Sequence, residues 1–312
     1  MTPHILVVGD CMLDVDEHLQ TVKESPEGVP VVAVERQDYR LGGASAVGAM
    51  CAALGATVDL VGVIGTDEES RIWWRLADQA GIRRLVPQLD RPTTSKLRLF
   101  VDGEQTLRID REVCDPLAAV TVLSLLTPAV STPDVMLVSD YGKGVYSREL
   151  LEDLRRRFPG VPVIVDPALA RSWEEYRGAT AIVPNHREWM ATERPMTLAQ
   201  AVYEFELEAI VLKQGANGIR LAGGQRADIP GLDVDAADVC GCGDQVLAAL
   251  GIAIAHGWDW LTAARFANAA GAAKVRKQGA TPVSWEEIED VSHGEFTNDQ
   301  CPRDHRPQSV GT

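Results

Sequence analysis

The stretch that decides the fold is DVCGCGD, residues 238–244, which is followed by an apolar run through Val246, Leu247 and Leu250. The spacing of that run predicts a helix beginning near Asp244. Glycines let backbone N–H groups approach an anion closely, and a helix N-terminus adds about half a positive charge there. The stretch predicts an anion site in which Asp244 takes a proton from a hydroxyl nucleophile; a glycine turn followed by a capping aspartate is the alternative interpretation.

Composition limits the classes of function. The 312 residues carry 30 Lys and Arg against 45 Asp and Glu, a formal charge of -15, which argues against nucleic acid or an anionic membrane as the main partner. A small anionic ligand in a locally basic pocket remains compatible. No apolar run reaches 18 residues and the first residues resemble a strand, so a cytoplasmic protein is predicted. The six cysteines are too sparse for a disulfide framework and are expected to be reduced thiols.

Short apolar runs alternate with helix-like stretches along the chain. Strands are predicted at 5–8, 58–64, 135–138, 161–165, 182–183 and 210–212. Helices are predicted at 44–54, 68–80, 147–158 and 198–208. This alternation is typical of a doubly wound α/β domain with a mostly parallel sheet, whose ligands bind at the carboxyl ends of the strands. The polar residues expected at those ends are Asp10, Asp14, Asp140, Asp166 and Asn185.

Two segments break this rhythm and have β character, Val29 to Tyr39 and Thr93 to Asp110. Asp102-Gly103 predicts a hairpin within the second of them. We expect a small β lid from about 13–39 and 93–112, inserted in one domain that spans 1–291. A polar tail, 292–312, is predicted to be disordered. Exposed lid strands favour pairing with a second subunit, so a homodimer through the lid is expected.

The lid also carries cations. Lys96 and Arg98 are two residues apart and share one face of a strand, and Arg108 lies on the returning strand. These side chains are placed to hold a phosphorylated substrate, although a solvated strand face has the same pattern.

Four motifs in order give the chain its family resemblance: Leu41-Gly42-Gly43-Ala44, Asn185-His186-Arg187-Glu188, Gln214-Gly215-Ala216-Asn217-Gly218 and the stretch ending at Asp244. With the elements above, they resemble the ribokinase-like (PfkB-type) carbohydrate kinases over nearly the whole chain. The resemblance implies a ribokinase-like fold, ATP and Mg²⁺ as cofactors, and a small sugar or sugar phosphate as the acceptor.

The resemblance also implies a role for individual residues. Asp244 would be the general base, and Gly241, Cys242 and Gly243 would form an anion hole for the transferring phosphoryl group. Asn185 and Glu188 would hold Mg²⁺ through water, or would only cap a helix. The residues that would face the sugar phosphate are Asp14, Gly42, Gly43, Lys96, Arg98, Asp140, Lys143 and Asp166. Those that would surround the nucleotide are Asn185, Lys213, Gly215, Gly218 and Asn268. Lys143 as a salt-bridged loop lysine and Asn268 as an ordinary helix residue are the alternatives.

Finer motifs resemble one branch of this family, the heptose 7-phosphate kinases. The most specific is Ser139-Asp140-Tyr141-Gly142-Lys143-Gly144, and Glu24-Ser25-Pro26-Glu27 is another. The branch implies phosphorylation of the C1 hydroxyl of a heptose 7-phosphate to give the 1,7-bisphosphate, by a kinase without a fused adenylyltransferase domain. A fructose or tagatose phosphate kinase, or a degenerate member that binds ligand without turnover, are the alternatives.

Four positions depart from the family pattern. Val239 stands where a threonine is usual, so a hydroxyl is missing. Cys242 replaces an alanine in the anion hole, Ala46 stands where an asparagine usually contacts the sugar, and Ala168 stands where a lysine is common. We expect the changes at Ala46 and Ala168 to affect sugar choice more than phosphoryl transfer, and the bulk of Cys242 to slow phosphoryl transfer. Cys242 is expected to make the enzyme sensitive to thiol oxidation if its pKa and access allow it.

Overall fold

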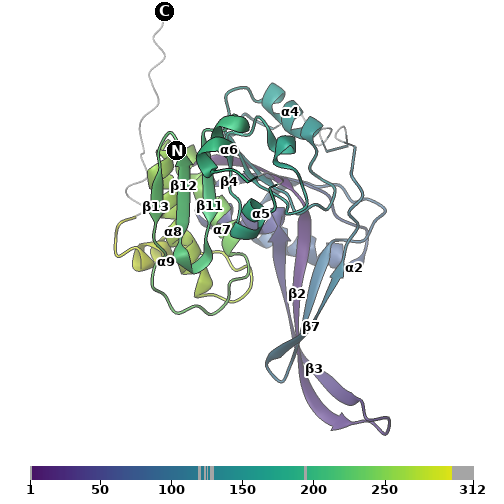
Figure 1. Cartoon of the computed structure of the whole chain (residues 1–312). Coiled ribbons are helices and arrows are strands. Elements are labelled where there is room, and N and C mark those ends of the chain that lie inside the picture. The colour runs from purple at the N-terminus through teal and green to yellow at the C-terminus, as the bar shows by residue number, and fades with distance from the viewer. Residues whose placement is uncertain are drawn as a thin grey trace, which may run out of the picture.

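The computed structural model describes residues 2–118, 121–122, 124, 126, 130–192 and 195–296. This part of the chain forms a nine-stranded sheet and a four-stranded sheet (Figure 1). The order of the larger sheet is β13 (Ala227–Ile229), β12 (Ile219–Gly223), β11 (Ala209–Lys213), β10 (Ala181–Ile182), β9 (Val163–Asp166), β8 (Val135–Ser139), β1 (His4–Gly9), β4 (Thr57–Val61) and β5 (Arg83–Leu85). From β11 to β5 neighbouring strands run parallel, whereas β12 and β13 pair antiparallel at one edge. The mostly parallel sheet is confirmed.

Helices cover both faces of this sheet because alternate side chains of a buried strand point to opposite faces. In β1, Ile5 and Val7 belong to one apolar core and Leu6 and Val8 to the other. Side chains of α1 (Ala44–Ala53), α2 (Glu68–Gln79), α7 (Cys242–Ala255), α8 (Trp260–Val275) and α9 (Trp285–Val291) complete the first core. Side chains of α4 (Arg148–Arg157) and α6 (Leu198–Glu204) complete the second, and the short α5 (His186–Met190) follows β10.

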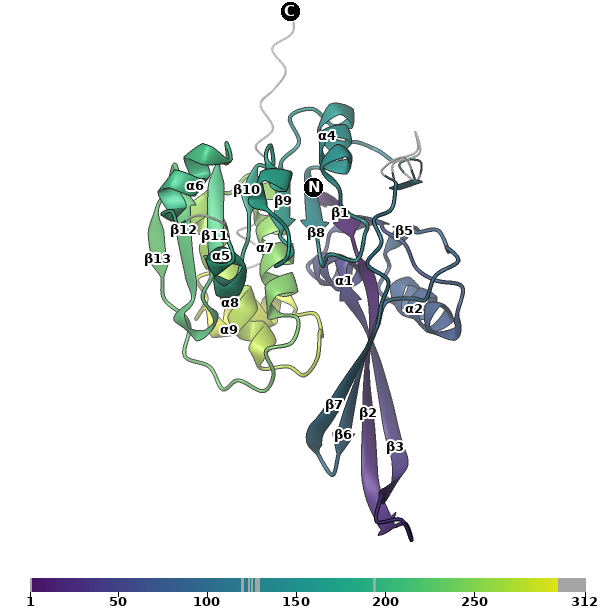
Figure 2. The same ribbon diagram turned by 45° about the vertical axis from the view of Figure 1, so that its right-hand side comes forward.

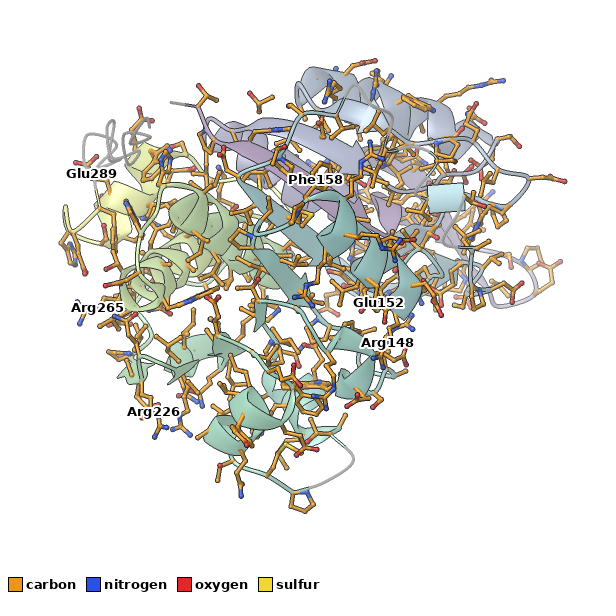
Figure 3. The ribbon with its side chains drawn as sticks, turned by 90° about the horizontal axis from the view of Figure 1, so that it is seen from above. Arg148, Glu152, Phe158, Arg226, Arg265 and Glu289 are labelled. Carbon is orange, nitrogen blue, oxygen red and sulfur yellow. The ribbon has the colours of Figure 1, made fainter. Side chains whose placement is uncertain are left out.

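Helix α4 shows how local sequence sets a boundary. Ser147 caps its N-terminus by accepting a hydrogen bond from the backbone N–H of Leu150 (3.2 Å), and Leu150 and Leu154 are buried against the sheet. On the exposed side, Arg148 donates to Glu152 one turn later (3.1 Å; Figure 3). The helices predicted at 44–54, 68–80 and 147–158 are found within one residue of those bounds, whereas the one predicted at 198–208 ends at Glu204.

The smaller sheet is the lid, with the order β3 (Pro30–Gly43), β2 (Cys11–Glu24), β6 (Ser95–Val101) and β7 (Glu104–Arg111). It projects from one end of the main domain (Figure 2). Asp102 (φ 51°) and Gly103 (φ 89°) form the tight turn between β6 and β7, as their dipeptide predicts. Strand β2 begins only two residues after β1 ends, so the lid continues directly from an interior strand of the main sheet.

The described chain stays packed beyond α9. Phe296 is buried, and its ring centroid lies 5.4 Å from that of Phe266 and 5.9 Å from that of Trp258. Residues 297–312, most of the predicted tail, lie outside the described residues. Within the described ranges, no helix combines the length and the apolar character needed to cross a membrane.

Candidate active site

The N-terminus of α7 forms the centre of the site. Gly241 caps this helix with a left-handed backbone (φ 76°), and a Cβ there would lie 2.8 Å from Cα of Ala280, so both conformation and space require glycine. Within the described chain, no hydrogen bond uses the N–H groups of Gly243 and Asp244, while that of Cys242 makes a long contact with the Val239 carbonyl (3.3 Å). The first turn therefore offers free donors and a positive helix end to an anion.

Asp244 lies in that first turn and is almost completely buried. Burial, followed by the nearby Asp166 carboxylate, raises the pKa of Asp244 to about 7. The phenol of Tyr141 donates a hydrogen bond to its Oδ1 (2.9 Å), which stabilises the ionised form and opposes the rise. A carboxylate with a pKa near neutrality accepts a proton more readily than an exposed aspartate, which suits a general base.

Tyr141 is a site residue that sequence reasoning missed. The lid ammonium of Lys96 lies over its ring, 4.6 Å from the centroid, so this tyrosine connects the lid with Asp244. Asp10 holds the loop that carries it by accepting hydrogen bonds from the N–H groups of Tyr141 (2.8 Å), Lys143 (3.0 Å) and Val145 (3.2 Å). The available signal was the position of Tyr141 within the branch-specific run 139–144.

Replacing Tyr141 with phenylalanine is expected to move the acid limb of the pH profile of kcat/KM upward by about one pH unit. The lost hydrogen bond stabilises the ionised Asp244, so its removal raises the pKa and more of the base is protonated at pH 7. The measurement is kcat/KM from pH 5.5 to 9. Tyr39→Phe, which removes a phenol of the lid bonded only to Gln37, is the matched control. An unchanged midpoint in Tyr141→Phe would contradict the role.

Asp166 and Lys213 lie beside the anion site. The Lys213 ammonium pairs with both Asp166 oxygens (2.6 and 2.8 Å), and a Cβ added to Gly243 would lie 3.3 Å from that ammonium. Asp166, predicted to face the sugar, is therefore adjacent to the phosphoryl-binding turn. This pair places one cation within reach of an anion bound at α7.

Asn185 and Glu188 form a capping box at the start of α5. The Asn185 side chain accepts from the N–H groups of Arg187 and Glu188, and the Glu188 carboxylate accepts from the Asn185 backbone N–H (2.6 Å) and side-chain amide. Burial, followed by the charge of Asp166, raises the pKa of Glu188 to about 7. Among the described residues, no group of three or more His, Cys, Asp or Glu is arranged to hold a metal directly. Two mutually repelling, half-buried carboxylates nevertheless fit a hydrated divalent cation held through water.

A cavity of about 400 Å³ adjoins the N-terminus of α7. Its walls bring together all the residues predicted around a nucleotide: Asn185, Lys213, Gly215, Gly218 and Asn268. Apolar side chains such as Ile219, Val234 and Val246 line the rest, which suits a flat apolar base attached to phosphates that point toward Gly243. A Cβ at Gly218 (φ 87°) would lie 2.2 Å from the carbonyl oxygen of Ile229, so only glycine permits this wall to close.

Asp14, on strand β2 of the lid, is buried, and one of its carboxylate oxygens (Oδ1) has no hydrogen-bond partner in the described chain. Burial raises the pKa of Asp14, whereas Arg98 and Lys96 of the lid lower it. Arg98 lies 3.7 Å from Asp14 and 3.3 Å from Asp16, and its other contact is the Cys240 sulfur (3.6 Å). A buried carboxylate with an open oxygen is suited to accept hydrogen bonds from ligand hydroxyls.

One of the two predicted glycines lies against this carboxylate. A Cβ at Gly42 would lie 3.2 Å from Cγ of Asp14, whereas Gly43 (φ 55°) caps α1 where a Cβ would meet the Asp10 carbonyl at 2.3 Å. Gly42 therefore keeps space open beside Asp14, and Gly43 allows the close packing against Asp10.

Two residues predicted on the sugar side have their polar groups occupied by protein partners. The Asp140 side chain has no exposed surface and accepts from Arg171 (2.7 Å), Tyr176 (2.8 Å) and the N–H of Gly142 (2.8 Å). Lys143 pairs with Glu112 (2.8 Å). That these two bind sugar stays a prediction; in this structure the alternative of a salt-bridged loop lysine describes Lys143, and Asp140 organises the loop that carries Tyr141.

The geometry matches a family of known activity. The model of the pfkB family carbohydrate kinases matches residues 2–287 of this chain. The chain belongs to the pfkB family. A kinase of this family phosphorylates a sugar with ATP, which accounts for a largely apolar cavity beside the N-terminus of α7 and a separate buried carboxylate, Asp14, with an unpaired oxygen.

Relatives of this pfkB-family kinase include a D-beta-D-heptose 7-phosphate kinase from Bordetella bronchiseptica, 38% identical over 91% of this chain and 94% of the relative. A bifunctional protein HldE from Bradyrhizobium diazoefficiens is 36% identical over 91% of this chain, which spans 62% of that relative's length. Among solved structures, a ribokinase from Thermotoga maritima (TM-score 0.71, 21% identity, 93% of this chain and 99% of that one) and the phosphofructokinase-2 of Escherichia coli (TM-score 0.73, 17% identity, 94% and 98%) share the fold.

The departures from the family pattern have definite surroundings in this kinase. Ala46 is buried in the apolar core, and the Ala168 N–H bonds the Tyr176 hydroxyl (2.9 Å). Burial raises the pKa of the Cys242 thiol to about 11, and that of Cys240 is also raised. A thiol with a raised pKa is mostly protonated at pH 7, which argues against the expected sensitivity of Cys242 to oxidation.

Proposed function

We propose that this kinase transfers the γ-phosphoryl group of ATP to the C1 hydroxyl of a heptose 7-phosphate and yields the 1,7-bisphosphate. The observation that carries the proposal is the open, buried Asp14 carboxylate beside the lid cations Lys96 and Arg98. The carboxylate suits sugar hydroxyls, and the cations suit a phosphate at the far end of the sugar. The heptose 7-phosphate kinase named among the relatives supports this choice of acceptor.

The chemistry follows from the positions of the residues around α7. Asp244 takes the proton of the C1 hydroxyl as its oxygen bonds to the γ-phosphorus, and the bond from that phosphorus to the bridging oxygen breaks to release ADP. The free N–H groups of Gly243 and Asp244 face the charge that develops on the transferring group, and Lys213 lies beside them. Positioning and charge stabilisation supply most of the acceleration in such a loose transition state.

We propose that Mg²⁺ accompanies ATP and is held through water by Asn185 and Glu188. When bound, it neutralises charge on the nucleotide phosphates. The raised pKa of Glu188 supports this role, because a nearby cation offsets the repulsion between its carboxylate and that of Asp166.

Phosphorus NMR of the protein with ATP, Mg²⁺ and a panel of heptose 7-phosphates, hexose phosphates and free sugars tests the proposal. The expected product is a new anomeric phosphate on a heptose 7-phosphate, with ADP formed in equal amount. Transfer only to a fructose or tagatose phosphate would preserve the kinase and reject the heptose. No transfer to any acceptor would favour a degenerate member that binds ligand without turnover.

We further propose that two copies pair through the lid. Strand β7 is exposed along its whole length, including Leu107 and Ile109, and the exposed Val32 and Val34 lie on the opposite edge strand, β3. Long exposed apolar edges favour pairing with another chain. Light scattering is expected to give twice the chain mass, and a monomer mass would contradict the pairing.

A further inference from the structure

A buried lysine beneath the anion site has no part in the chemistry described so far. Lys274 lies in the last turn of α8 and is completely buried; among the described residues, it is the only buried Lys, Arg or His. A buried ammonium is costly unless an opposite charge or several hydrogen bonds compensate for it. In the described chain it forms no ion pair, and the contact found for it is one donated hydrogen bond to the Lys277 carbonyl (3.0 Å).

The end of α8 is joined to the loop that forms the anion site, residues 238–243. The Val275 carbonyl accepts hydrogen bonds from the N–H groups of Ala237 (2.7 Å) and Asp238 (3.0 Å). The Asp238 carboxylate then accepts from the N–H groups of Cys240 (2.9 Å) and Gly279 (2.7 Å), which binds the loop to the turn after α8. This network places Lys274 directly behind the loop.

The electrostatic neighbours of Lys274 agree with that placement. Burial lowers the pKa of Lys274, while interactions with Cys242, Asp238 and Cys240 raise it. The same interaction lowers the pKa of Cys242, in opposition to burial. Water and salt screen the electrostatic interactions of a buried charge only weakly. The Lys274 ammonium therefore acts on the backbone donors of residues 240–243 and on an anion bound to them.

We infer that Lys274 is an electrostatic positioning residue, whose positive charge behind residues 238–243 strengthens the anion site for the transferring phosphoryl group. In the described chain the ammonium interacts with the Asp238 carboxylate without forming an ion pair, and a phosphoryl group at the N-terminus of α7 would add a further opposite charge. The inference rests on the proposed phosphoryl transfer. A helix cap alone would explain the hydrogen bond to Lys277 but does not require a full charge.

Three variants separate charge from structure. Lys274→Gln keeps a hydrogen-bond donor without the charge, Lys274→Arg keeps the charge, and Arg276→Met removes an exposed cation of the same helix end that pairs with Asp290. Lys274→Gln is expected to lower kcat by about 10- to 100-fold with KM for ATP and sugar within about twofold of wild type. Lys274→Arg and Arg276→Met are expected to retain most of the activity. Lys274→Met serves as the neutral variant if Lys274→Gln does not fold by circular dichroism.

A binding measurement supplies a readout that a merely structural role would not change. The probe is ADP with Mg²⁺ and aluminium fluoride, which mimics the transferring phosphoryl group, and the readout is the rise in unfolding temperature beyond that given by ADP alone. We expect this additional rise in unfolding temperature in the wild type, in Lys274→Arg and in Arg276→Met. The neutral variant is expected to lose the additional rise but to keep the rise in unfolding temperature that ADP alone produces.

The outcomes distinguish the two proposals. If the neutral variant kept the wild-type kcat and the wild-type rise in unfolding temperature with aluminium fluoride, the role of Lys274 would be overturned and the proposed kinase activity would stand. Equal losses in the neutral variant and Lys274→Arg would also overturn it, because the shape of the side chain would then matter rather than its charge. If the wild-type protein showed neither turnover nor the additional rise in unfolding temperature with aluminium fluoride, the proposed function itself would be rejected.

Discussion

Asp244→Asn is expected to lower kcat by about 10²- to 10⁴-fold while KM for ATP and for the sugar phosphate changes little. Asparagine preserves the shape of the side chain and accepts the Tyr141 hydrogen bond, but cannot take a proton from the C1 hydroxyl. Steady-state kinetics at pH 8 with isothermal titration of both ligands measures the two effects. Asp228→Asn, an exposed carboxylate paired with Arg220, is the matched control.

The same variant is expected to unfold at an equal or higher temperature at pH 7. The folded-state pKa of Asp244 is raised, so its stabilisation is complete below the unfolded pKa and is lost as pH rises through about 7. A neutral amide avoids that loss. Turnover close to wild type in Asp244→Asn would contradict its role as base, whereas lost ligand binding would show that the substitution disturbs the site.

Asp14→Asn is expected to raise KM for the sugar phosphate by about 100-fold and leave KM for ATP unchanged. The open Oδ1 is the acceptor proposed for sugar hydroxyls, and an amide nitrogen in its place cannot accept. The cavity proposed for the nucleotide does not include Asp14 among its lining residues. Initial rates with each substrate varied in turn give both constants, with Asp38→Asn, a half-buried lid carboxylate paired with Arg36, as control.

Asp14→Asn is also expected to stabilise the ligand-free protein at pH 7. Burial raises the pKa of Asp14, so ionising this group opposes folding above that pKa, and the neutral variant escapes the cost. The difference in unfolding temperature should shrink as pH falls toward the unfolded pKa of about 4, where both proteins carry a neutral group. A loss of affinity for ATP equal to that for sugar would contradict the assignment.

The sequence predicts the features that depend on local pattern. Buried strands such as 135–138 are visible as uninterrupted apolar runs, and the glycines around Asp244 indicate an anion-binding helix start. The residues predicted to surround the nucleotide come from separate motifs along the chain. They line one cavity because the carboxyl ends of parallel strands lie at the same edge of the sheet.

Features that depend on packing between distant residues could not be read in this way. Tyr141 reaches Asp244 from 103 residues away, and Asp140 is occupied by Arg171 and Tyr176, 31 and 36 residues further along the chain. The local amino-acid sequence does not distinguish an aspartate that binds a ligand from one that binds other side chains of the protein. The short strand β5 and the antiparallel edge strands β12 and β13 were also absent from the predicted set, because segments of three to five residues have weak periodicity.

The junction between β1 and β2 has a mechanical consequence. One residue, Asp10, separates β1, an interior strand of the main sheet, from the long strand of the lid, and its carboxylate also holds the loop of Tyr141. The lid and the loop that carries Tyr141 therefore meet at Asp10. Because Lys96 of the lid lies over the phenol ring that bonds Asp244, a movement of the lid that seats the sugar would also change the surroundings that set the basicity of Asp244.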